Sequence, residues 1–103
     1  MKKLTESFNE AAVSKGERFC IELASNPSTG YSWDIKLKQG KARLIDEAFV
    51  SDAKAPMLVG AGGKEVLTYM AEEAGTILID AQYKRAWENN PPLQQHSFKI
   101  TVK

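Results

Sequence analysis

The stretch Asn26-Pro27-Ser28-Thr29-Gly30-Tyr31-Ser32-Trp33 joins two runs in which apolar and polar residues alternate. Pro27 fixes its own φ angle and disfavours helical geometry at Asn26, and Gly30 permits a positive φ angle just before the second run. The two residues between them are small, with hydroxyls that can hydrogen-bond to the local backbone. These residue types fit an ordinary hairpin connection, and they equally fit a narrow, stiff loop that presents its tip to a partner.

The runs on either side of this stretch alternate with a period of two, which is typical of half-buried β-strands. Residues 17–23 lead into the stretch, and residues 31–38 form the run that follows. Residues 76–85 and 98–102 alternate in the same way. The side chains expected to face inward are Phe19, Ile21, Leu23, Tyr31, Trp33, Ile35, Leu37, Ile77, Ile79, Ala81, Tyr83, Phe98, Ile100 and Val102.

The remaining segments are less regular. About the first dozen residues favour a first edge strand of uncertain register, and residues 42–50 break strict alternation as a β-bulge does. Residues 64–71 predict a strand whose inward face the pattern does not assign. Residues 51–63 contain a proline and three glycines with little periodicity, so they predict a long excursion between strands.

About seven short strands separated by turns, with no helical period, predict an all-β, immunoglobulin-like antiparallel β-sandwich. At 103 residues the chain fits a single domain spanning residues 1–103. Trp33 falls where immunoglobulin-like folds bury a Trp on the third strand, so we expect it in the core. Cys20 is the only cysteine, so the disulfide of antibody domains is absent and the likeness is one of architecture.

Composition excludes several classes of protein. The net charge of +1 gives no field that would attract nucleic acid or an anionic membrane surface. No apolar run approaches the roughly 20 residues of a membrane span, and polar residues interrupt any signal-peptide core near the N-terminus. We expect no nucleic-acid or membrane partner and a monomer when free, while the cellular compartment stays undetermined.

Strand parity places the unusual residues together. If successive strands run up and down, the connections at residues 26–30, 60–63 and 85–87 all emerge at one end of the sandwich. Gly62 and Gly63 have no side chains, so their backbone can lie flush against a partner. Rigid loops on a sandwich end form a binding device.

Catalysis is not expected. His96 is the only histidine, and Cys20 lies on a strand face far from it in sequence, so no Cys–His pair is predicted. No cluster of Cys, His and carboxylates has metal-ligand spacing, and residues 60–63 lack the helix and Lys-Ser/Thr pair of a phosphate loop. The chain is expected to be a binding protein without metal or cofactor.

Arg85 and Trp87 are of the residue types most enriched among interface hot spots. A Trp beside a polar loop is harder to explain as core than Trp33, so contact is the favoured interpretation of Trp87. The pattern leaves Arg85 open between a contact and a solvated charge. Residues 88–90, Glu-Asn-Asn, are expected to be solvated loop.

Three motifs together resemble the signatures of the chagasin family of cysteine-peptidase inhibitors. Residues 26–31, Asn-Pro-Ser-Thr-Gly-Tyr, resemble that family's Asn-Pro-Thr-Thr-Gly-Tyr/Phe. Residues 60–63, Gly-Ala-Gly-Gly, match its Gly-x-Gly-Gly, and residues 85–87, Arg-Ala-Trp, resemble its Arg-Pro-Trp/Phe. The order and spacing agree across nearly the whole chain. Ser28 replaces a Thr, which is a mild departure, and Ala86 replaces a Pro, which is a larger one.

The resemblance implies a reversible inhibitor of papain-like cysteine peptidases whose three loops fill the active-site cleft as a wedge. It implies that Ser28 and Thr29 approach the catalytic Cys, that residues 60–63 lie along the cleft, and that Arg85 and Trp87 pack on the opposite wall. The implied peptidase-binding residues are Asn26, Pro27, Ser28, Thr29, Gly30, Tyr31, Gly60, Ala61, Gly62, Gly63, Arg85, Ala86 and Trp87.

Two other interpretations stay open from the residues alone. An immunoglobulin-like module could hold a carbohydrate or a non-peptidase protein at the same end, with Tyr31 and Trp87 stacking and the neighbouring Asn pair hydrogen-bonding. A purely structural domain would instead use its edge strands for assembly.

Overall fold

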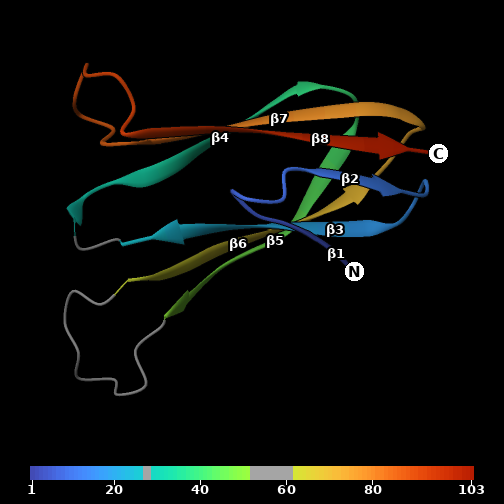
Figure 1. Cartoon of the computed structure of the whole chain (residues 1–103), viewed down its shortest axis with the longest axis horizontal. Coiled ribbons are helices and arrows are strands. Elements are labelled where there is room, and N and C mark those ends of the chain that lie inside the picture. The colour runs from blue at the N-terminus through green and yellow to red at the C-terminus, as the bar shows by residue number, and fades with distance from the viewer. Residues whose placement is uncertain (27–28, 52–61) are drawn as a thin grey trace.

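The computed structural model describes residues 1–26, 29–51 and 62–103. Two four-stranded sheets pack face to face as a β-sandwich, which confirms the predicted all-β, immunoglobulin-like architecture with eight strands rather than about seven (Figure 1). Within the described part of the chain, no helix is long and apolar enough to cross a membrane. The strands are β1 (Lys2–Leu4), β2 (Glu10–Val13), β3 (Arg18–Ser25), β4 (Ser32–Gln39), β5 (Ala42–Ser51), β6 (Gly63–Ala71), β7 (Gly75–Lys84) and β8 (Gln94–Val102).

The sheets have the strand orders β1-β3-β6-β5 and β2-β8-β7-β4. Strands β3 to β8 pair with one another only in antiparallel fashion. The two short N-terminal strands pair in parallel, β1 with β3 and β2 with β8. The N-terminal residues thus form two short edge strands, one in each sheet, and not the single first edge strand that was expected. Leu4 and Val13 are both buried, one from each sheet, whereas Phe8 lies exposed in the turn between them. The turn carries the chain from one sheet to the other, so each sheet gains a short edge strand.

The core fills the space between the sheets. The inward faces of residues 17–23, 76–85 and 98–102 are as predicted. The structure also assigns the face of β6 that the pattern left open, because Leu67, Tyr69 and Ala71 are buried. Burying each large apolar side chain stabilises the fold by about 1.5–3 kcal/mol. The fully buried large side chains are Leu4, Phe19, Ile21, Leu23, Leu67, Ile77, Ile79, Phe98 and Ile100.

Strands β4 and β5 are the least regular. A register shift between Leu44 and Asp46 confirms the bulge expected in residues 42–50, and a second shift follows Leu37 in β4. Leu37 pairs opposite the fully buried Ile79, so it lies on the inward face as predicted, yet it is 45% exposed. A bulge increases the local twist of a strand, and this one lies beside Leu37 near the end of the edge strand β4.

Two carboxyl groups are diagonal neighbours on the inward face of one sheet. Glu65 shares its face with Leu67, and Glu47 pairs directly opposite Leu67 on β5. Burial, followed by a hydrogen bond and charge repulsion from Glu47, raises the pKa of Glu65 to about 7 from its ordinary 4.5. Glu65 thus keeps its proton in the folded protein at pH values where the unfolded chain has lost it.

We expect Glu65→Gln to stabilise the protein at pH 8 by about 1 kcal/mol and to leave its stability at pH 4 unchanged. Below pH 4.5 Glu65 is protonated in both folded and unfolded chains. As pH rises towards 7 only the unfolded chain ionises freely, so the wild type loses stability while the Gln variant does not. Urea unfolding at both pH values measures the difference, with Glu72→Gln in an exposed turn as control. An equal gain at both pH values would contradict the assignment.

Candidate functional site

The ends of β3, β5 and β7, from which the three connections with the unusual residues leave, lie at one end of the sandwich (Figure 1). The first loop (residues 26–31) joins β3 to β4, the second (residues 52–62) joins β5 to β6, and the third (residues 85–93) joins β7 to β8. We call this region the loop end. The parity prediction is confirmed for its described residues. Pro27, Ser28, Gly60 and Ala61, which were predicted to belong to the site, lie outside the described residues.

The first loop is held by its own hydrogen bonds. The Thr29 backbone N–H and hydroxyl both donate to the Asn26 carbonyl, at 3.2 and 2.8 Å. The Thr29 hydroxyl also accepts a bond from the Tyr31 N–H at 3.3 Å. Gly30 has φ +81°, a conformation that glycine adopts at little cost. The described part of this loop is the narrow, internally bonded turn that its residue types favour.

Aromatic residues of the core contact the first loop on its inner side. The Tyr83 hydroxyl accepts a hydrogen bond from the Asn26 N–H at 3.0 Å, and the Tyr83 ring lies 5.3 Å from Tyr31 and 4.7 Å from Trp33. The Trp33 indole donates to the Ala24 carbonyl at 3.0 Å. Trp33 is buried, so its core assignment is confirmed. The pattern predicted Tyr83 only as an inward side chain, because alternation says nothing of where its hydroxyl points.

The third loop begins with a tight turn. The Glu88 N–H donates to the Arg85 carbonyl at 3.2 Å, which places Ala86 and Trp87 at the two central positions. Trp87 is 72% exposed, so it is not a core residue. Its ring lies against Gly30 of the first loop, where an added Cβ would sit 2.7 Å from the nearest ring atom. The first and third loops therefore touch.

Arg85 bridges the same two loops. Its Nε donates to the Thr29 carbonyl at 3.1 Å, and its guanidinium carbon lies 4.5 Å from the centre of the Tyr31 ring. Its Nη1 is 3.1 Å from a Glu88 carboxylate oxygen. The sequence left Arg85 open between a contact and a solvated charge. The structure shows an internal role that neither interpretation included.

The expectation that residues 88–90 are solvated loop is wrong for Glu88. Its side chain is only 28% exposed, and its second carboxylate oxygen accepts a bond from the Asn90 amide at 3.1 Å. Hydrogen bonds from Arg85, and then from Asn90, lower the pKa of the Glu88 carboxyl. The sequence signal for this arrangement is weak, since a single Glu three residues after an Arg is common on solvated surfaces.

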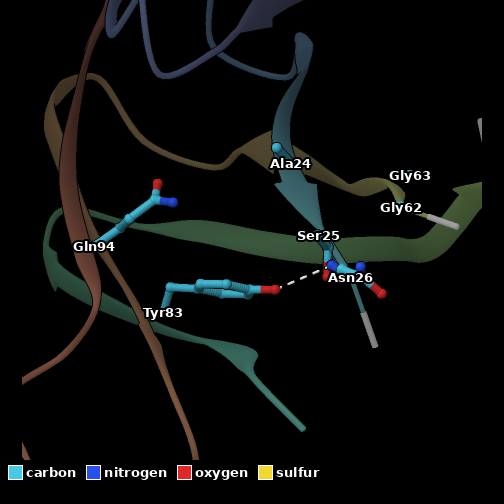
Figure 2. Close-up of a pocket in the computed structure, with 7 residues that line it drawn as sticks. All are labelled: Ala24, Ser25, Asn26, Gly62, Gly63, Tyr83 and Gln94. Atoms are coloured by element: carbon cyan, nitrogen blue, oxygen red, sulfur yellow. Dashed lines mark hydrogen bonds between the residues drawn. The ribbon is translucent and has the colours of Figure 1, made fainter. Parts of the chain in front are cut away.

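The second loop meets the first across an open hollow of about 290 Å³ (Figure 2). Gly63 cannot be replaced without a clash, because an added Cβ would collide with the Val50 carbonyl and lie 2.7 Å from the Phe49 ring. Backbone therefore forms much of this side of the hollow. Its lining residues are Ala24, Ser25, Asn26, Gly62, Gly63, Tyr83 and Gln94.

The groups that could support catalysis are far apart in the fold. Cys20 is buried on β3 in one sheet, and burial raises the pKa of its thiol, so it is a poor nucleophile. His96 lies on β8 in the other sheet, with its ring 5.8 Å from Trp33. Among residues 1–26, 29–51 and 62–103, no group of His, Cys, Asp and Glu could hold a metal ion.

The loop end and sandwich define a binding protein, and comparison with known proteins gives its class. Residues 12–102 match the model of the family described as "Chagasin family peptidase inhibitor I42". The chain belongs to this family. The resemblance of the three motifs is thereby confirmed, as is the expectation that the protein is an inhibitor and not an enzyme.

The alignments with individual relatives cover almost the full length of both proteins. The chain is 33% identical to amoebiasin-1 of Entamoeba histolytica, covering 96% of this chain and 97% of that protein. It is 30% identical to chagasin of Trypanosoma cruzi, covering 98% and 96%. Among solved structures, a cysteine protease inhibitor from Entamoeba histolytica superposes with a TM-score of 0.85 at 26% identity, covering 99% of this chain and 95% of the other. The solution structure of amebosin superposes with a TM-score of 0.76 at 30% identity, covering 99% and 97%.

The contact between Gly30 and Trp87 predicts different behaviour for two glycine variants. Gly16 also has positive φ, at +85°, but an added Cβ there meets nothing within 4 Å. Gly16→Ala and Gly30→Ala should each lose about 1–2 kcal/mol of stability from backbone strain. Only Gly30→Ala should also displace the Trp87 ring, which acrylamide quenching of Trp fluorescence detects as increased accessibility. Identical quenching in both variants would contradict the loop contact.

Proposed function

We propose that this protein is a reversible, tight-binding inhibitor of papain-like cysteine peptidases that blocks their active-site cleft with its three loops. The observation that carries the proposal is the junction of the first and third loops. Arg85 and Trp87 hold the third loop against Thr29 and Gly30, so that these two residues of the first loop lie beside an exposed indole. Family membership supplies the class of target.

The first loop is the part that enters the cleft. In the proposed complex Ser28 and Thr29 approach the catalytic Cys and exclude substrate, with Asn26, Pro27, Gly30 and Tyr31 shaping the tip. The Asn26 carbonyl is already bonded twice by Thr29, so this turn is preformed. Preforming avoids an ordering penalty of roughly 0.5–1.5 kcal/mol per immobilised side chain.

The second loop lies along the cleft through its backbone. Gly62 and Gly63 border the open hollow between the loops, where a partner can approach the main chain closely. Gly60 and Ala61 complete this segment of the proposal. The hollow also offers the Asn26, Tyr83 and Gln94 side chains to groups on the rim of the cleft (Figure 2).

The third loop supplies the main apolar contact. Trp87 exposes 72% of its surface beside Gly30, and Trp is one of the residue types most enriched among interface hot spots. Ala86 lies next to it on the same turn and Arg85 supports it. Together the three loops can reach the standard interface size of roughly 800 Å² per partner.

The carbohydrate-binding alternative fits the structure less well. Sugar stacking needs an open aromatic face, but one face of Tyr31 is covered by the Arg85 guanidinium and its ring also stacks on Tyr83. The exposed aromatic rings near this end, among the residues that the structure describes, are Trp87 on the third loop and Phe49 near the end of β5. The observations favour a protein cleft over a sugar.

Titrating papain with this protein tests the proposal. Inhibition of substrate hydrolysis should reach completion near one equivalent, and the inhibitor should be recovered intact. Trp87→Ala should raise the inhibition constant by at least tenfold, because a buried hot-spot Trp contributes 2 kcal/mol or more on truncation. Phe8→Ala is the matched control, since Phe8 is 59% exposed in a different part of the chain and should have no effect. Absence of inhibition by the folded wild type at micromolar excess would refute the proposal for papain-like targets.

Ala86 allows a gain-of-affinity test. It occupies the second position of the Arg85–Glu88 turn, where Pro is favoured, and no described residue other than glycine has positive φ, which fits a type I turn. Ala86→Pro should stabilise the turn by about 0.4–1 kcal/mol and tighten inhibition by about two- to fivefold. Inhibition constants and thermal unfolding measure the two effects. A tenfold loss of inhibition would show that the third loop takes a different conformation in the complex.

A further inference from the structure

We infer that Glu88 is a positioning residue of the inhibitory surface, which holds the Arg85 side chain and through it the tip of the first loop. This inference rests on the proposed function, because the surface that Glu88 organises is the one proposed to enter the peptidase. The three family motifs of the sequence do not include Glu88.

Both oxygens of the Glu88 carboxylate have partners. Oε1 is 3.1 Å from Arg85 Nη1, and Oε2 accepts a bond from Asn90 Nδ2 at 3.1 Å. The Glu88 N–H donates to the Arg85 carbonyl, so backbone and side chain of the two residues are joined within one turn. The carboxylate is thus held on each side and fixes one edge of the guanidinium.

Fixing that edge sets the rest of the Arg85 group. A guanidinium is planar with its donors in a rigid fork, so holding Nη1 towards Glu88 determines where Nε points. In the structure Nε donates to the Thr29 carbonyl at 3.1 Å, and the guanidinium carbon lies 4.5 Å from the Tyr31 ring centre. Without Glu88 the long Arg side chain regains its rotamers, and the bridge between the third and first loops loosens.

Glu88 is poorly placed to bind the peptidase itself. Its carboxylate oxygens are engaged within the loop and its side chain is 28% exposed, whereas Trp87 beside it is 72% exposed. The same hydrogen bonds lower the pKa of its carboxyl, so Glu88 stays ionised and the bridge stays intact at mildly acidic and neutral pH. Its effect on inhibition passes through Arg85.

A double-mutant cycle on papain inhibition tests whether Glu88 acts through Arg85. Glu88→Ala should raise the inhibition constant about three- to fivefold, in the range of a partly exposed ion pair, and Arg85→Ala should raise it further. If Glu88 acts only through Arg85, the double variant should equal Arg85→Ala, a clear departure from additivity. Glu73→Ala removes a more exposed ion pair, with Lys41 at 3.3 Å, in the turn between β6 and β7, and should change nothing.

A second measurement uses the free protein and does not depend on any peptidase. In amide NMR spectra Glu88→Ala should shift the Thr29, Gly30 and Tyr31 signals, although these residues lie more than fifty positions away in sequence, while leaving the unfolding temperature near that of the wild type. Glu73→Ala should leave the three signals in place. Unchanged first-loop signals, or additive effects on inhibition, would overturn the positioning role. If the wild type failed to inhibit papain while the signals moved, the proposed function alone would fall.

Discussion

The guanidinium of Arg85 joins the first and third loops of the proposed binding surface. It donates to the Thr29 carbonyl and lies over the Tyr31 ring, while the neighbouring Trp87 packs on Gly30. Each of these contacts is modest alone, since partly exposed ion pairs and cation–π contacts typically contribute about 1 kcal/mol or less. Together they join two loops, separated by more than fifty residues of chain, into one connected surface.

The sandwich makes this junction possible. Strand parity brings the loops to one end, and Tyr83 on β7 supports the first loop through its hydroxyl and its ring. Trp33 below it ties β4 to the carbonyl of Ala24 on β3, so the layers beneath the first loop are held in register. Rigidity at the loop end therefore comes from the core aromatics as much as from the loop residues, and in the proposed complex this rigidity would limit the ordering needed on binding.

Much of the fold could be predicted from the sequence because alternation reports directly which side chains face inward. Residues 17–23 and 76–85 show this clearly. The pattern failed where a short polar turn moves the chain between sheets, as around Phe8. It also did not predict that Leu37, although on the inward face, would be 45% exposed. The candidate site residues were predicted from motifs, but the hydrogen bonds of Glu88 were not, since internal hydrogen bonding in a loop leaves no periodic trace in sequence.

The most direct test of the account is to map the surface that this protein presents to a peptidase. Amide NMR of the labelled protein bound to papain, with the catalytic Cys blocked by a small alkyl group, reports each contact along the described chain. The account predicts perturbed signals at Asn26, at residues 29–31, at Gly62 and Gly63, and at residues 85–88, with the turns at the opposite end unchanged. Perturbation centred on the β5 edge, or on the turns around Gly16 and Gly75, would contradict the claim that the loop end is the inhibitory surface.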